Sequence, residues 1–139
     1  MGILTQKGEL GMEIINITKN VALAKQVVIA DKPYTRLKGL LGKKNLPSET
    51  AMLLMPCNCI HSCFMRFAFD AVFLGESGQV VHIRKGVKPF TVTPIIKAAK
   101  AVLEVPSGTI NLTNTEVGDI LVSKGGVILK NLKKGDDRI

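Results

Sequence analysis

Three cysteines and a histidine lie close together in the middle of the chain, at Cys57, Cys59, His61 and Cys63. Cysteine and histidine are the usual ligands of zinc, so a metal site is the first chemistry to consider. On one face of a strand, side chains two residues apart lie about 6.5–7 Å from each other, so these four would extend over about 20 Å. Zinc holds each ligand at a distance of only about 2.0–2.3 Å. The spacing therefore predicts no cofactor, with zinc bound from a loop as an alternative.

The same residues permit a second chemistry, in which Cys57 is a thiol nucleophile and His61 is its base. Such a thiol needs an accessible, electropositive environment, and its base needs an orienting group that the sequence does not supply. Packing is the simpler interpretation, because a reduced cysteine behaves as a small buried hydrophobe. On the expected strand these residues share one face with Met65, Phe67 and Phe69. We therefore expect them to lie in the core and favour a protein that is not an enzyme.

The opposite face of this segment carries Arg66 and Asp70. A salt bridge or a capped turn would account for both residues. A sharper hypothesis is a polar pocket for a small ligand. Its candidate ligand-binding residues are Arg36, His61, Met65, Arg66 and Asp70. No catalytic residues are assigned, because the chain contains no paired carboxylates, nucleophile elbow or glycine-rich phosphate loop.

Length and composition are those of a single globular domain, with 139 residues, 46% of them hydrophobic and 22% charged. No run approaches the roughly 20 apolar residues that span a membrane, and the N-terminus does not resemble a secretory signal. The cysteines are odd in number and crowded, unlike those of a secreted disulfide scaffold. We therefore predict a cytoplasmic protein with no membrane partner.

The formal net charge is +8, and two windows carry basic residues without any acid. They are residues 32–44 (Lys32, Arg36, Lys38, Lys43 and Lys44) and residues 84–100 (Arg84, Lys85, Lys88, Lys97 and Lys100). Basic surface attracts nucleic acids and other polyanions. Lysine outnumbers arginine, however, and aromatic residues are not interleaved with the charges, so a solvated surface is the favoured interpretation.

Short runs of β-forming residues are separated by turn signals along most of the chain. They lie at 12–18, 21–31, 51–55, 59–65, 71–75, 79–85, 99–105, 119–123 and 126–130, with one short amphipathic helix expected at 33–41. The pattern predicts a mainly β fold, a single-domain sandwich or barrel of about eight short strands with one or two short helices. We expect residues 12–139 to form this domain. Residues 1–11 are expected to be a disordered or mis-called extension, with Met12 as the true start.

Four motifs occur in a recognisable order: residues 36–42 (RLKGLLG), residues 61–66 (HSCFMR) with Asp70, residues 102–108 (VLEVPSG) and residues 117–119 (VGD). Together they resemble domain of unknown function family 192. The resemblance implies a compact, mostly β fold without an established activity, in a branch common in bacteria. Cys59 and Cys63 depart from the family pattern, where other residue types usually occur.

Three functions remain open. The favoured one is a non-enzymatic binding or accessory domain that holds a small ligand or a protein partner in the polar pocket. The alternatives are a thiol- or metal-dependent enzyme that uses Cys57 and His61, and a polyanion-binding protein that uses the basic windows. The sequence does not indicate an oligomeric state.

Overall fold

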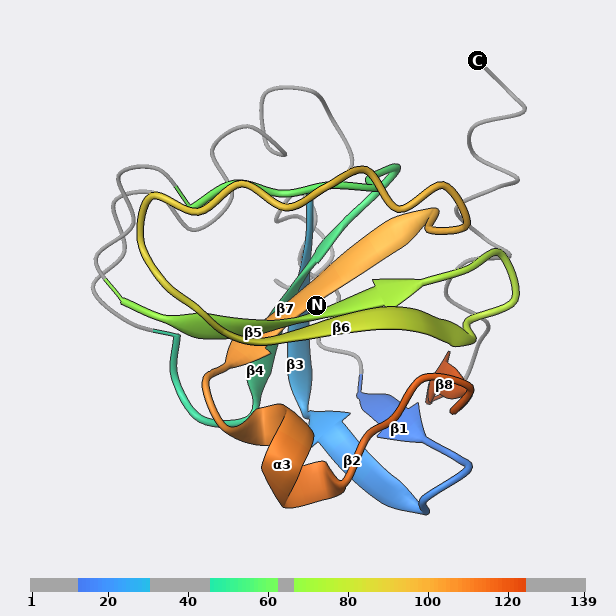
Figure 1. Cartoon of the computed structure of the whole chain (residues 1–139). Coiled ribbons are helices and arrows are strands. Elements are labelled where there is room, and N and C mark those ends of the chain that lie inside the picture. The colour runs from blue at the N-terminus through green and yellow to red at the C-terminus, as the bar shows by residue number, and fades with distance from the viewer. Residues whose placement is uncertain (1–12, 31–45, 63–66, 125–139) are drawn as a thin grey trace.

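Short runs of Ile, Val, Leu and Ala form the strands, and turns rich in Asn, Gly and Pro separate them. The computed structural model describes residues 13–30, 46–62 and 67–124, which form two open β-sheets and one short helix (Figure 1). The strands are β1 (Ile14–Asn16), β2 (Val21–Ala24), β3 (Gln26–Ala30), β4 (Thr50–Leu54), β5 (Phe69–Leu74), β6 (Val80–Val87), β7 (Ala101–Pro106) and β8 (Leu121–Ser123), and the helix is α3 (Thr109–Thr113). The predicted mainly β fold is confirmed.

The smaller sheet has the strand order β2-β1-β8, and the larger has the order β3-β4-β7-β5-β6. Neighbouring strands are antiparallel except for the parallel pair β3 and β4. The sheets meet at both ends, because β2 continues into β3 through Lys25 and a bridge joins Gln79 to Ile120. Gly78 permits this bridge, since a Cβ there would lie 2.5 Å from the Leu121 carbonyl oxygen. The two sheets therefore enclose a common core.

The central strands of the larger sheet, β4, β5 and β7, are buried on both of their faces, whereas the edge strands β3 and β6 are partly exposed. One apolar cluster, which includes Leu53 and Leu103, fills the space between the sheets. A second cluster, which includes Leu54 and Phe73, lies on the opposite face. Every residue of β5 is buried for this reason, and the strand has a nearly continuous apolar sequence instead of an alternating one.

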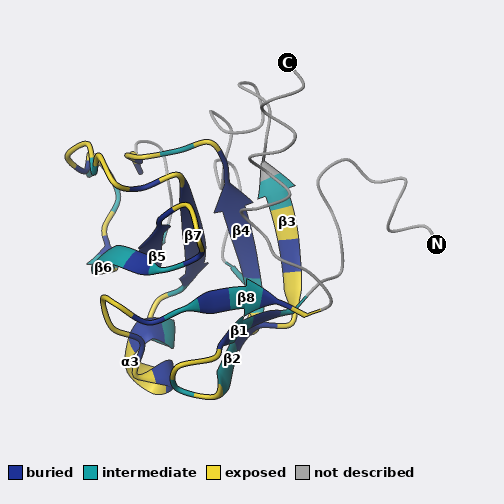
Figure 2. Ribbon diagram, turned by 90° about the vertical axis from the view of Figure 1, so that its right-hand side faces the viewer, coloured by how far each residue is buried: buried dark blue, intermediate teal, exposed yellow. Residues whose placement is uncertain are grey.

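Two irregular segments cover the second face, and we call them together the outer ribbon (residues 56–62 and 90–100). They run side by side across the larger sheet (Figure 1). Backbone hydrogen bonds join them from Cys57 to Lys100 (3.0 Å), Ile96 to Asn58 (2.9 Å), Thr93 to Ile60 (2.9 Å) and Ser62 to Thr91 (2.8 Å). Burial differs sharply between the central strands β4, β5 and β7 and the mostly exposed segment that follows β6 (Figure 2). The ribbon thus packs one side on the sheet and presents the other to solvent.

Two strand predictions need correction. The strand expected at 21–31 is broken into β2 and β3, because the backbone N–H groups of Lys25 and Gln26 both donate to the Glu49 carbonyl, at 2.7 and 3.2 Å. The strand expected at 59–65 is wrong over its described part, residues 59–62, where only a bridge between His61 and Val92 forms.

The remaining element predictions have mixed outcomes. The sequence did not predict α3, which is a single turn that begins after Gly108. The strand expected before Pro106 is confirmed as β7. The helix expected at 33–41, the strand expected at 126–130 and the extension at 1–11 lie outside the described residues.

Glu104 is a carboxylic acid buried on the face of the larger sheet that the outer ribbon covers. Its register partners are Met52 on β4 and Ala71 on β5, and its exposed fraction is 3%. Within the described parts of the chain, no hydrogen bond or ion pair reaches its carboxylate. Loss of solvation therefore raises the pKa of Glu104 to about 8. The folded protein holds this side chain in its neutral form at neutral pH.

The titration of Glu104 predicts a stability that falls as the pH rises. In the unfolded chain a glutamate ionises above its ordinary pKa of 4.5, whereas in the folded chain Glu104 stays protonated up to about pH 8. Ionisation of Glu104 should therefore lower the free energy of unfolding of the wild type progressively as the pH rises between these values. We expect Glu104→Gln to remove this pH dependence. The free energy of unfolding of the variant should therefore rise relative to that of the wild type from pH 4.5 to pH 8. Urea denaturation across this range measures it.

Glu49→Gln is the matched control, because the Glu49 carboxylate is 60% exposed. Its pH profile should follow that of the wild type. Parallel profiles for the wild type and Glu104→Gln would contradict the assignment.

Candidate functional site

Cys57, Cys59 and His61 lie on the outer ribbon, and of these three only Cys57 packs against the core. Cys57 is half-buried, and its thiol donates a hydrogen bond to the carbonyl of Cys59 at 3.1 Å. Cys59 and His61 are exposed. The alternating pattern assigned these residues to a core face, and for Cys59 and His61 that prediction is wrong. The ribbon turns Ile60 and Ser62 toward the sheet. The residue before Ile60 and the residue between the two therefore face outward.

Ser62 fixes the turn that leads from β6 into the ribbon. Its backbone N–H donates to the Thr91 carbonyl, and its hydroxyl accepts a hydrogen bond from the Thr91 N–H, both at 2.8 Å. The hydroxyl also donates to the carbonyl of Lys88. The carbonyl of Ser62 accepts from the Phe90 N–H at 3.1 Å. One fully buried serine therefore holds residues 88–91 in place, a role that the sequence did not reveal.

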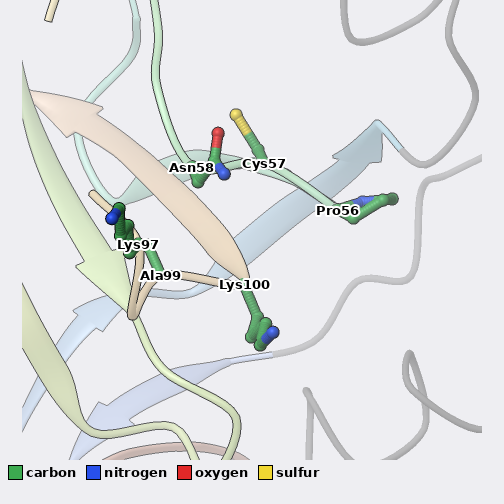
Figure 3. Close-up of a pocket in the computed structure, with 6 residues that line it drawn as sticks. All are labelled: Pro56, Cys57, Asn58, Lys97, Ala99 and Lys100. Atoms are coloured by element: carbon green, nitrogen blue, oxygen red, sulfur yellow. The ribbon is translucent and has the colours of Figure 1, made fainter. Parts of the chain in front are cut away.

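A pocket of about 270 Å³ lies between the two segments of the ribbon. Its lining residues are Pro56, Cys57, Asn58, Lys97, Ala99 and Lys100, and the lysines lie on the segment opposite Cys57 and Asn58 (Figure 3). The walls are tied together by the backbone hydrogen bonds from Cys57 to Lys100 and from Ile96 to Asn58. These bonds fix the spacing of the two backbone segments that line the pocket.

The chemistry of this lining favours anions. Two lysines, one asparagine and one cysteine are among the lining residues, and no Asp or Glu of the described ranges is one of them. Lysine ammonium and amide N–H groups donate hydrogen bonds to phosphate and carboxylate oxygens. The sequence counted Lys97 and Lys100 only as members of a basic window and did not associate them with Asn58.

Asp70 is buried and accepts hydrogen bonds from backbone groups of two other elements. Its Oδ1 accepts from the N–H of Gly86 at 2.8 Å, and its Oδ2 accepts from Gly108 and Ile110, each at 3.0 Å. These bonds connect β5 to β6 and to the start of α3. Both oxygens are therefore committed to structural bonds, and a ligand-binding role for Asp70 stays a prediction.

Of the other predicted ligand-binding residues, only His61 is among the described residues, so the predicted pocket stays a prediction. Arg36, Met65 and Arg66 lie outside the described residues, as does Cys63. In the described ranges no group of three or more His, Cys, Asp or Glu side chains is placed to hold a metal ion. Among the helices of these same ranges, none is long and apolar enough to cross a membrane.

Asp70→Asn tests the structural role of Asp70, because it keeps the size of the side chain and replaces one acceptor oxygen by a donor. We expect the free energy of unfolding to fall by about 2–4 kcal/mol, since the buried N–H groups lose charge-assisted hydrogen bonds. Urea denaturation at neutral pH measures this loss. The control Glu116→Gln removes an exposed partner of Lys19 and should cost less than about 1 kcal/mol. An equally small effect of Asp70→Asn would contradict the role.

Comparison of sequences places the chain among proteins without an assigned activity. The family DUF192, described as "Uncharacterized ACR, COG1430", matches residues 14–123. The UPF0127 protein of Thermococcus sibiricus is 33% identical over 114 residues, which cover 76% of this chain and 71% of the relative. The UPF0127 protein of Pyrococcus furiosus is 31% identical over 113 residues, with coverage of 78% and 95%.

Comparison of structures gives the same picture at the level of the fold. A protein of unknown function from Novosphingobium aromaticivorans has a TM-score of 0.71 at 20% identity and covers 81% of this chain and 84% of its own. A putative transcription regulator from Sinorhizobium meliloti has a TM-score of 0.69 at 21% identity, with coverage of 82% and 92%. The two relatives found by sequence, from Thermococcus and Pyrococcus, are archaeal, so a bacterial origin of this chain stays a prediction. The family match over most of the described residues confirms the predicted resemblance, and the chain belongs to this family of uncharacterised proteins.

Proposed function

We propose that this protein is a non-enzymatic binding or accessory domain that holds a small anionic ligand in the pocket of the outer ribbon. The observation that carries the proposal is that Lys97, Lys100 and Asn58 all line one space of about 270 Å³. A small phosphate or carboxylate compound matches both the size and the charge of this space. The net charge of +8 would assist the approach of such a ligand.

The geometry supports binding more than thiol catalysis. The Cys57 thiol is half-buried and donates a hydrogen bond to the Cys59 carbonyl, whereas a nucleophilic thiol needs an accessible, electropositive environment. His61 is exposed on the outer side of the ribbon, where it forms a bridge with Val92. The polyanion-binding alternative stays a prediction, as does the cytoplasmic location.

Loss of the two pocket lysines tests the binding proposal. We expect the double variant Lys97→Gln/Lys100→Gln to bind inorganic phosphate and succinate about tenfold or more weakly than the wild type, because two charge-assisted hydrogen bonds are lost. Isothermal titration calorimetry at low ionic strength measures the dissociation constants. The control Lys25→Gln removes a lysine that is 62% exposed in the connection between β2 and β3. Equal affinities for the double variant and the control would refute the pocket.

Alkylation rates test the thiol alternative. Cys59 is exposed, whereas Cys57 is half-buried and hydrogen-bonded, so iodoacetamide should modify Cys59 about tenfold or more faster in the native protein. Peptide mass spectrometry over a time course resolves the two sites. In denaturant the two rates should converge. If native Cys57 reacted faster than Cys59, the thiol-dependent function would become the better proposal.

A further inference from the structure

Three large apolar residues within six positions of the second segment of the outer ribbon are exposed. Phe90 is 72% exposed, Val92 is 68% exposed and Ile95 is 65% exposed. We call them the apolar face of the ribbon. The other exposed large hydrophobic residues of the described ranges are Ile17, Val28, Leu112 and Val117, which belong to separate elements or turns. Single exposed apolar residues are ordinary, whereas a group on one short segment marks an interaction surface.

The backbone around Phe90 holds this aromatic residue in an unusual conformation. Its φ is 63°, a region that bulky residues rarely adopt. The hydrogen bonds of Ser62 to residues 88–91 maintain the turn in which Phe90 lies. Strained backbone positions of this kind cluster where a protein binds its partners. The fold therefore accepts a local conformational cost while Phe90 stays exposed.

Basic side chains flank the apolar face along the chain. Residues 84–100 contain five basic residues and no acidic one. Lys85 and Lys88 precede Phe90 and are exposed, and Lys97 and Lys100 follow Ile95 and are exposed as well. A partner for this surface must accept apolar side chains and also supply negative charge on both sides of them.

We propose that the apolar face and its flanking lysines dock onto an anionic lipid bilayer, with Phe90, Val92 and Ile95 entering the interfacial layer. Interfacial segments combine Phe and aliphatic residues with lysines that contact lipid phosphates. Lysine suits a diffuse negative surface, whereas a protein site built for paired carboxylates favours the fork of arginine. This proposal departs from the sequence-based expectation of no membrane partner. The two proposals share Lys97 and Lys100, but none of the three apolar residues lines the pocket, so substitution of those three tests the bilayer and leaves the proposed ligand site intact.

Vesicle co-sedimentation of the full chain tests the proposal. We expect binding to vesicles of phosphatidylcholine with about 30% phosphatidylglycerol, little binding to pure phosphatidylcholine, and a steep loss of binding with added salt. The triple variant Phe90→Asn/Val92→Ser/Ile95→Ser should bind the anionic vesicles about tenfold or more weakly. Asparagine is chosen at position 90 because it tolerates a positive φ.

Leu112→Ser/Val117→Ser is the matched control, because it removes two exposed apolar residues, one on α3 and one in the turn before β8. It should retain wild-type binding, and thermal unfolding should show that both variants are folded. Undiminished binding by the triple variant would overturn the proposal, as would equal binding to neutral and anionic vesicles. Binding to polyglutamate without any binding to vesicles would also overturn it and would assign the surface to an acidic protein partner.

Discussion

A sheet that is apolar on both faces must be covered on both sides, and the rest of this structure follows from that constraint. The smaller sheet covers one face through the cluster that contains Leu53 and Leu103. The outer ribbon covers the other face with Ile60 and Ala99. A ribbon needs to hide only its inner side, so its outer side can carry residues that are unsuited to a core. Cys59, Val92 and Ile95 lie there for this reason.

Buried polar side chains hold the covering segments in place. An unpaired polar group in the interior costs about 1–3 kcal/mol, so the geometry of each buried acceptor is tightly constrained by its donors. Asp70 binds three backbone N–H groups, and Ser62 binds both ends of the turn at residues 88–91. Glu104 is different, because the described residues give it no such donors and the fold keeps it neutral instead. Asp70 thus joins β5 to β6 and to the start of α3, and Ser62 joins the two segments of the outer ribbon at the turn after β6.

The sequence predicted the strands of the larger sheet well because β4, β5 and β7 are apolar runs bounded by turn residues. It failed at residues 59–62 because alternation of side chains assigns a face only where the segment is a strand of the sheet. The pocket was also beyond prediction, since Cys57 and Lys97 are distant in the sequence and only backbone hydrogen bonds between the ribbon segments bring their walls together. Asp70 was recognised as important, but its three donors could not be named without the fold.

The surplus of positive charge on the ribbon gives the two proposed interactions a common physical origin. Lys85, Lys88, Lys97 and Lys100 are exposed, and the segment that carries them contains no acid to offset their mutual repulsion. Like charges held on one surface raise the energy of the folded state, and any bound anion lowers it. A small ligand would relieve this repulsion at the pocket, whereas a bilayer would relieve it along the whole segment. The contacts differ, because the pocket relies on Asn58 and the bilayer on the apolar face, but the electrostatic driving force is the same.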